Sequence, residues 1–116
     1  MPEMHAWSTL SDSDQQAVRR VMEYWVRHWD WECPTLFGLE LDELIRTVET
    51  WPRVAAGSEE TTRMAAVGAL RELFGGSAPP RAELTELVGR SYEQASELAA
   101  AVYALAEISA GNVRGD

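Results

Sequence analysis

The sequence has no lysine and only one cysteine. The scarcity of cysteine excludes several kinds of site. All ten basic residues of the 116-residue chain are arginines. With Cys33 alone, the chain forms no intramolecular disulfide, and it lacks the cysteine pair that begins a zinc knuckle or a redox motif. We therefore expect a reducing, cytoplasmic environment.

Long apolar segments are also absent. The stretch richest in alanine, valine and leucine, residues 98–106, is about half of the roughly 20 residues that a membrane-spanning helix needs. No apolar segment follows a basic start near residue 1, so we expect no secretion signal and no membrane association. A chain of this length buries one core but not a deep multi-substrate pocket as well. We expect a single domain, 1–116, with flexible segments at 1–10 and 111–116.

Positive charge is scarce throughout the chain. There are 19 acidic and 10 basic residues, a formal net charge of -9. Residues 1–58 hold ten acids and five arginines, and residues 59–116 hold nine acids and five arginines, so the excess belongs to the folded body. A negatively charged body repels nucleic-acid phosphates and attracts cationic partners. The charge balance therefore disfavours nucleic-acid binding and favours a protein partner with a basic surface.

Hydrophobic periodicity predicts an all-α protein, a compact bundle of about five helices without strands. Apolar spacings of three and four predict helices at about 12–30, 40–51, 59–74, 81–88 and 92–109. Residues 31–38 are expected to form a connector, because Pro34 biases Cys33 away from helical dihedrals. Its expected anchors are Leu36 and Phe37.

Capping residues and apolar stripes predict where these helices end and which sides face inward. Ser11 and Ser58 are expected to cap the helices that follow them, and Ser91 with Gln94 has capping-box spacing. Gly75-Gly76 is expected to supply a left-handed stop, and Gly89 to end the helix 81–88. The expected inward residues of the helix 40–51 are Leu41, Leu44, Ile45 and Val48.

No reactive centre stands out, so we expect a non-enzymatic protein without a cofactor. Residues 28–33, HWDWEC, contain every side-chain type that binds a transition metal, but helical spacing brings together only His28 and Glu32. The other histidine is His5, and two ligands do not make a tetrahedral site. Carboxylates around Cys33 raise a thiol pKa, so we expect a structural cysteine and not a nucleophile.

Residues 81–106 have the hydrophobic spacing and the turn glycine of a helix-turn-helix. A DNA-recognition helix carries donors for base edges and cations for phosphates. Between Glu83 and Glu107, however, the chain has five acids and only Arg90 as a cation. We favour an ordinary helical hairpin, and a transcriptional regulator using this segment is the alternative function.

The densest run of acids lies between residues 30 and 43, where five acids and no basic residue are interleaved with Trp31, Leu36 and Phe37. Trp31 cannot share the inner face of Trp29, because two residues turn a helix by about 200°. It either plugs the end of the bundle with Phe37 or faces outward as an anchor with an acidic rim. The outward alternative predicts a partner-binding surface made of Asp30, Trp31, Glu32, Glu40, Asp42 and Glu43.

Three segments carry a family resemblance: HWDWECPTLFGL at residues 28–39, the helix end Trp51-Pro52, and VGALREL at residues 67–73. Together they resemble small bacterial proteins associated with immunity proteins of contact-dependent or polymorphic toxin systems. The resemblance spans about residues 20–75. It implies a non-enzymatic cytoplasmic inhibitor that occludes a cognate toxin domain, commonly a basic nuclease, and it supplies no site residues.

Overall fold

The computed structural model describes residues 6–54, 57–75 and 79–114, with side chains described as far as Glu107. Within these ranges it contains one 3-10 helix, six α-helices and no strand, which confirms the predicted all-α bundle. The elements are η1 (Ala6–Thr9), α1 (Asp12–Arg27), α2 (Cys33–Phe37), α3 (Leu41–Thr50), α4 (Glu59–Phe74), α5 (Arg81–Val88) and α6 (Tyr92–Arg114).

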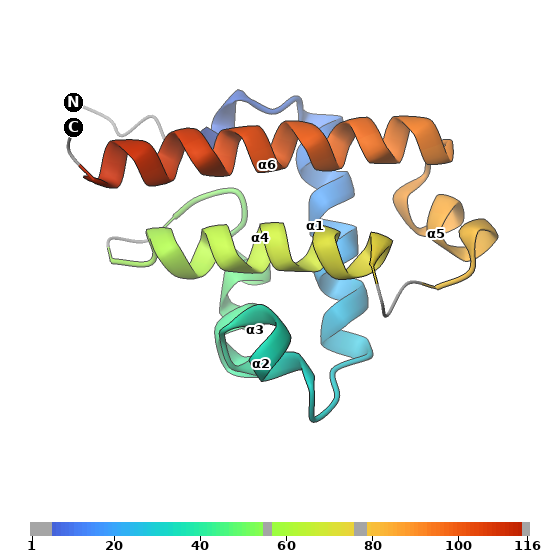
Figure 1. Cartoon of the computed structure of the whole chain (residues 1–116), viewed down its shortest axis with the longest axis horizontal. Coiled ribbons are helices and arrows are strands. Elements are labelled where there is room, and N and C mark those ends of the chain that lie inside the picture. The colour runs from blue at the N-terminus through green and yellow to red at the C-terminus, as the bar shows by residue number, and fades with distance from the viewer. Residues whose placement is uncertain (1–5, 55–56, 76–78, 115–116) are drawn as a thin grey trace.

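Helix α1 is the central element of the bundle. Helices α4 and α6 lie side by side and run in opposite directions, and α1 crosses behind them (Figure 1). Helices α2 and α3 lie on the side of α4 away from α6, and α5 lies near the start of α6. Because α1 contacts α3, α4 and α5, a broad stripe of it is buried: Ala17, Val18, Val21, Met22 and Trp25.

Two tryptophans join α1 to its neighbours by hydrogen bonds as well as by packing. The buried Trp25 indole donates from Nε1 to the Ala69 carbonyl of α4 at 2.9 Å. Trp51, which follows α3, donates from Nε1 to the Gln15 carbonyl of α1 at 2.9 Å. Each indole therefore buries its ring while its N–H keeps an acceptor, as buried tryptophan requires.

The N-terminal segment contributes to the same core. Trp7 packs against Trp51 with ring centroids 5.4 Å apart, and both Trp7 and Leu10 are buried. These two residues were expected to lie in a flexible segment, because a short run with few apolar residues carries no periodic signal. Residues 1–5, which include His5, lie outside the described part of the chain.

Two expectations about the region between α1 and α3 were wrong. The first helix ends at Arg27, not near residue 30, and the predicted connector contains the one-turn helix α2. Pro34 lies in the first turn of α2, where a missing backbone N–H removes no helical hydrogen bond. Pro34 therefore lies at the start of a helix and does not prevent one, contrary to the prediction from its sequence position.

The predicted caps divide into those that form and those that do not. The Ser11 hydroxyl accepts from the Asp14 N–H at 3.0 Å, and the Ser91–Gln94 capping box is present. Gly89 ends α5 in the left-handed conformation, with φ 77°. Ser58 precedes α4 but makes no side-chain cap hydrogen bond, so that prediction was wrong.

The ends of α4 and α6 also differ from expectation. Gly75 has φ -104°, which is not left-handed, and Gly76 lies outside the described residues. Helix α6 continues through Arg114 instead of ending near residue 109. Gly111 was expected to begin a tail, but a glycine costs only about 1 kcal/mol inside a helix and does not end one by itself.

One predicted inner residue of α3 faces solvent. Leu44 and Val48 are buried as expected, whereas Ile45 is 37% exposed and Thr47 takes an inner position. The Thr47 hydroxyl donates to the Glu43 carbonyl at 2.9 Å. Because this hydroxyl is satisfied within its own helix, threonine is tolerated inside and the buried face is rotated away from Ile45.

A glycine lets α2 approach α4 closely. A Cβ atom placed on Gly68 of α4 would lie 2.9 Å from Cδ2 of Phe37. The Phe37 ring is 3% exposed and also contacts Trp25 and Trp29, with centroid distances of 5.8 and 5.2 Å. The missing side chain at residue 68 therefore makes the space in which Phe37 fixes α2 to the bundle.

We expect Gly68→Ala to lower the free energy of unfolding by about 1 kcal/mol, although alanine is the better helix former. The helix gain of about 1 kcal/mol is outweighed by overpacking against a buried ring, which costs about 1–3 kcal/mol. Urea denaturation measures the difference. Ala100→Gly at an exposed position of α6 calibrates propensity alone, and a stabilised Gly68→Ala variant would contradict the close packing.

Candidate functional site

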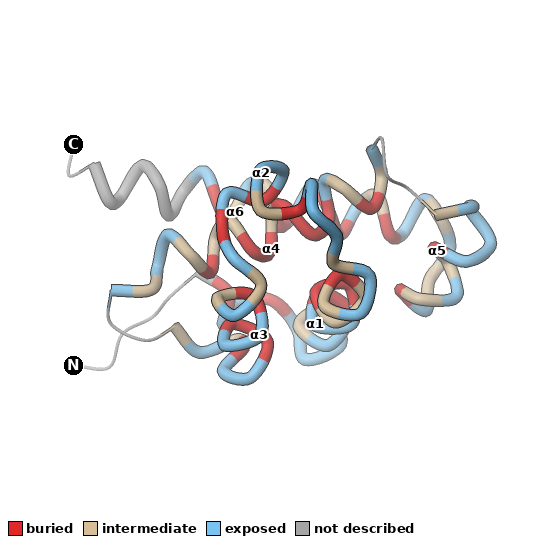
Figure 2. The backbone as a smooth tube through the Cα atoms, turned by 90° about the horizontal axis from the view of Figure 1, so that it is seen from below, coloured by how far each residue is buried: buried red, intermediate tan, exposed pale blue. Residues whose placement is uncertain are grey.

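The structure places the six predicted surface residues on two separate elements. Asp30, Trp31 and Glu32 lie in the connection between α1 and α2, which Figure 2 shows as exposed. Glu40, Asp42 and Glu43 lie at the start of α3. The two groups are separated along the chain by α2, Gly38 and Leu39, so the predicted site consists of two acidic segments.

Trp31 faces outward. Its side chain is 85% exposed, whereas Phe37 is buried. Phe37 therefore belongs to the core, and Trp31 does not plug the end of the bundle with it. Among the described residues, the exposed large hydrophobic side chains are Trp31, Leu36 and Ile45, and all three lie between residues 31 and 45. Of the two expected anchors of the connector, only Phe37 belongs to the core. The exposed apolar side chains thus coincide with the acidic run in the sequence.

A compact turn holds Trp31 in its exposed position. The Asp30 carboxylate oxygen Oδ1 accepts from the Glu32 N–H at 3.0 Å and from the Cys33 thiol at 3.4 Å. On the inner side, Trp29 packs against Phe37 and Cys33 is buried. Asp30 therefore stabilises the turn as well as adding charge, while the Trp31 side chain projects from the turn into solvent.

Cys33 has the environment of a structural thiol. Burial raises the pKa of the Cys33 thiol, and the nearby carboxylates of Asp30 and Glu32 act in the same direction, against a backbone hydrogen bond that lowers it. A nucleophilic cysteine needs the opposite, an accessible thiolate stabilised by positive charge. The arrangement favours the structural role expected from the sequence.

The acidic residues at the start of α3 are partly used within the protein. Glu43 accepts the Glu40 N–H at 2.8 Å and so caps the helix. Asp42 lies 3.5 Å from the Arg46 guanidinium, in a pair whose two side chains are both well exposed and which therefore contributes little. Within the described residues, Asp30, Glu32 and Glu40 have no ion pair. Most of the predicted acidic surface therefore keeps its charge.

Among the possible metal ligands of residues 28–33, the pair in contact is Asp30 and Cys33, at 3.4 Å, and not the expected pair of His28 and Glu32. His28 stacks on Tyr24 with ring centroids 4.1 Å apart, and its Nδ1 lies 2.8 Å from the Tyr24 carbonyl oxygen. The ring thus turns back along α1, away from a helical pairing with Glu32. Within the part of the chain that the structure describes, no group of three or more histidine, cysteine, aspartate or glutamate side chains could hold a metal ion.

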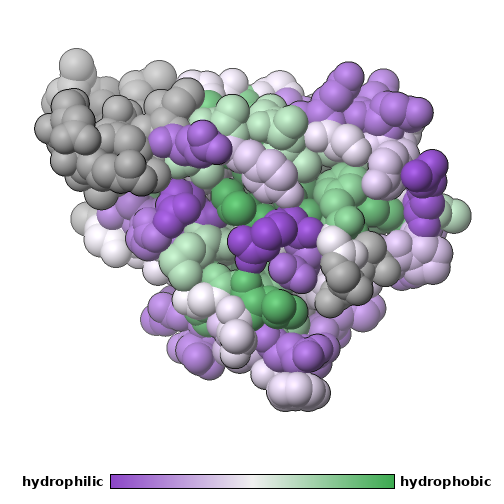
Figure 3. Space-filling view, viewed as in Figure 1, coloured by the Kyte–Doolittle hydropathy of each residue, from purple (hydrophilic) through white to green (hydrophobic). Residues whose placement is uncertain are grey.

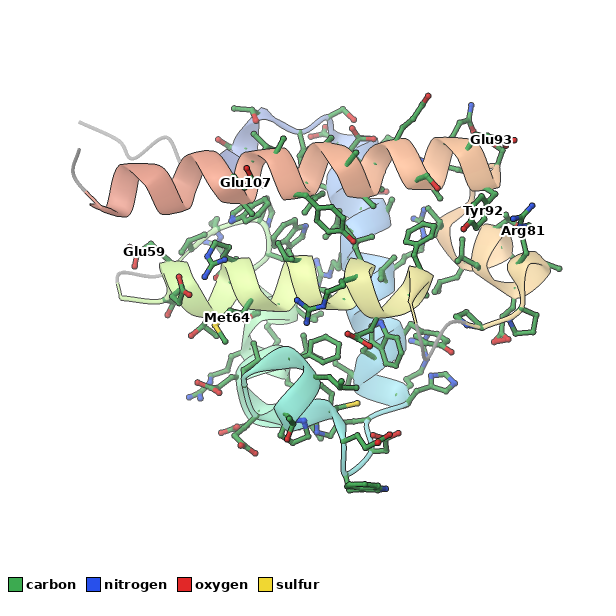
Figure 4. All side chains as sticks on the ribbon, viewed as in Figure 1. Glu59, Met64, Arg81, Tyr92, Glu93 and Glu107 are labelled. Carbon is green, nitrogen blue, oxygen red and sulfur yellow. The ribbon has the colours of Figure 1, made fainter. Side chains whose placement is uncertain are left out.

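The segment behind the helix-turn-helix alternative forms a helical hairpin of α5 and α6. At its junction the Arg81 guanidinium lies 4.0 Å from the centre of the Tyr92 ring. Figure 4 labels the two residues, which lie next to each other. Arg90, the cation nearest the turn, pairs with Asp14 at 2.6 Å. The first turns of α6 expose Glu93 and other uncharged or acidic side chains, so the hairpin offers phosphates little attraction. Binding of DNA stays the alternative prediction.

A polar groove between α3 and the start of α4 was not predicted as a site. We call it the α3–α4 groove, and its volume is about 590 Å³. Its lining residues are Glu43, Arg46, Thr47, Glu49, Thr50, Gly57, Ser58, Thr61 and Thr62. The hydroxyl residues at 47, 50, 58, 61 and 62 were the signal in the sequence, but only the fold shows that the two segments face each other.

Hydrophobic surface on one face of the bundle lies mainly between the helices (Figure 3). On the face shown in Figure 3, it is visible between α6 and α4 and between α4 and α2, with hydrophilic surface around it. Among the described residues, no helix has the length and apolar character needed to cross a membrane.

Searches against protein-family models, curated proteins and solved structures find no match to this chain.

We expect Trp31→Ala to leave the free energy of unfolding within about 0.5 kcal/mol of the parent, because its indole is largely in water. Phe37→Ala should lower it by about 3–5 kcal/mol, since it removes a buried ring. Chemical denaturation of both variants checks the opposite placement of the two aromatic residues. Comparable losses in the two variants would show that Trp31 belongs to the core.

We expect Cys33 to react slowly with iodoacetamide at pH 8 in the folded protein and rapidly in urea. Burial shields the thiol, and its raised pKa keeps it protonated. Mass spectrometry at fixed times measures the modified fraction. A folded-state rate close to that of the unfolded chain would contradict a structural role for Cys33.

Proposed function

We propose that this protein is a non-enzymatic, acidic binding protein, and specifically a bacterial immunity protein that binds and occludes a cognate toxin domain with a basic surface. The observation that carries the proposal is the coincidence of exposed Trp31 with the acidic surface around it. The Trp31 side chain is 85% exposed, and tryptophan is, with tyrosine and arginine, enriched at the energetic centres of interfaces.

The two components of this surface have different tasks in binding. The net charge of -9 and the unpaired carboxylates accelerate encounter with a cationic protein over long range. Trp31 is then buried against the partner, and this burial slows dissociation of the complex. The mechanism is occlusion, which needs a complementary surface and no reactive group.

The turn beneath Trp31 supports a rigid presentation of the anchor. Hydrogen bonds from the Glu32 N–H and the Cys33 thiol to Asp30 fix the backbone on one side, and the Trp29–Phe37 contact fixes it on the other. A side chain presented by a fixed turn loses less conformational freedom on binding. This favours a docking role over a chance exposure.

The test is to look for a toxin domain encoded beside the gene of this protein and to measure binding to it, with protection of cells that express it; a neighbourhood without a toxin gene would contradict the proposal. Raising the salt concentration from about 25 to about 500 mM should slow association by about tenfold or more, because screening removes the long-range attraction. Trp31→Ala should raise the dissociation rate constant by about tenfold or more. Surface plasmon resonance separates the two rate constants.

Charge variants identify the surface that steers association. Asp42→Asn with Glu43→Gln removes two charges and keeps an acceptor for the Glu40 N–H, and it should slow association. Glu83→Gln with Glu86→Gln on α5 is the matched control and should have little effect. If salt and the first pair of changes leave association unaltered, the surface assignment is wrong. Retention of DNA in a gel at low salt, without toxin binding, would support the regulator instead.

A further inference from the structure

The α3–α4 groove contains a polar side chain that the protein itself does not satisfy. Thr62 is 3% exposed and lines the groove, and within the described residues its hydroxyl has no hydrogen-bond partner. The other threonine hydroxyls on the α3 side are satisfied: Thr47 donates to the Glu43 carbonyl and Thr50 to the Arg46 carbonyl. Buried hydroxyls in proteins are nearly always hydrogen-bonded, so Thr62 points to a polar group bound in the groove.

The charges around the groove favour a cation over an anion. Glu43 and Glu49 both line it, and Glu49 has no ion pair or hydrogen bond among the described residues. Arg46 is the one basic residue among the described lining residues, and its guanidinium lies 3.5 Å from Asp42, a residue outside the lining. The first turn of α4 adds Glu59, while the neighbouring Glu60 is paired with Arg63. Figure 4 shows Glu59 at the end of α4 that borders the groove.

The lining also fits a ligand with an alkyl stem and a cationic head. Each threonine offers a methyl group beside a hydroxyl, and four threonines line the groove. Arginine and lysine side chains lay their methylene stems along apolar groups while the head binds polar groups. The volume of about 590 Å³ lies within the roughly 300–1,000 Å³ of ordinary ligand pockets.

We infer that the α3–α4 groove is a second binding site, which receives one basic side chain, arginine or lysine, of the protein partner. Glu49 and Glu43 accept from the cationic head, and the Thr62 hydroxyl accepts a further hydrogen bond at the buried end. This inference rests on the proposed function for the identity of the partner. It adds a specific pocket to a surface that otherwise acts through Trp31 and unspecific charge.

The test uses the full chain alone and measures residue-specific NMR shifts with small probes. We expect n-butylguanidinium or n-butylammonium to cause saturable shifts of the Glu49, Thr61 and Thr62 amides. The neutral isostere n-butylurea and the anion butyrate should not. Saturable shifts of these amides with butyrate would show an anion site at the start of α4 and would overturn the inference, as would the lack of localised shifts with either cation.

Thr62→Val separates binding from folding, because valine keeps the shape of the side chain and removes its hydroxyl. We expect the variant to bind the cationic probe about tenfold more weakly, in line with the loss of a hydrogen bond to a charged group. Its thermal midpoint should equal or exceed that of the parent, since an unpaired hydroxyl has been removed. Thr85→Val on α5, outside the groove, is the matched control and should leave probe affinity unchanged.

Glu49→Gln is a second test of the groove, and it leaves the core unchanged because Glu49 is exposed. It should also weaken binding of the cation. Unchanged probe affinity in both Thr62→Val and Glu49→Gln would overturn the inference. The probes contain no toxin, so their failure leaves the Trp31 proposal standing, and failure of toxin binding leaves the groove result standing.

Discussion

The contact between Phe37 and Gly68 is the constraint on which the functional surface depends. Only an absent side chain at residue 68 leaves room for the ring, and the ring in turn joins α2 to α4, Trp25 and Trp29. With Phe37 held inside, the preceding turn has one inner and one outer side. Trp29 occupies the inner side and Trp31 the outer side. The close approach of Phe37 to Gly68 thus determines both the packing of α2 and the exposure of Trp31.

The arginines explain how an acidic chain keeps so much negative charge available. Arg20 donates to the Leu87 and Val88 carbonyls at the end of α5, and Arg71 donates to the Leu36 carbonyl at the end of α2. These guanidinium groups satisfy carbonyls that helix ends leave unpaired, a task suited to a planar group with five donors. They join helices and do not neutralise the carboxylates between residues 30 and 43. Among the side chains that the structure describes, only Arg46 pairs with one of these carboxylates.

Local patterns predicted those parts of the fold in which one segment decides its own structure. The bounds of α5 and the Ser91–Gln94 capping box followed from neighbouring residues and were confirmed. The predictions for Pro34 and for the inner face of α3 were wrong for two different reasons. Helix α2 packs on Gly68, a tertiary contact that the local sequence does not show. Thr47 is buried although it is polar, because its hydroxyl bonds to the Glu43 carbonyl of its own helix. The acidic surface was visible in the sequence. The α3–α4 groove was not, since Glu49 and Thr62 meet only after two helices pack.

The unequal environments of the five tryptophans give the molecule an intrinsic optical signal. Trp7, Trp25 and Trp51 are enclosed by protein and Trp29 is half enclosed, while the Trp31 ring lies in solvent. A collisional quencher therefore reaches chiefly one of the five fluorophores. Shielding of that fluorophore would report occupancy of the surface around Asp30 and Glu32 without any attached label, and the enclosed indoles would report in the same spectrum whether the bundle is intact.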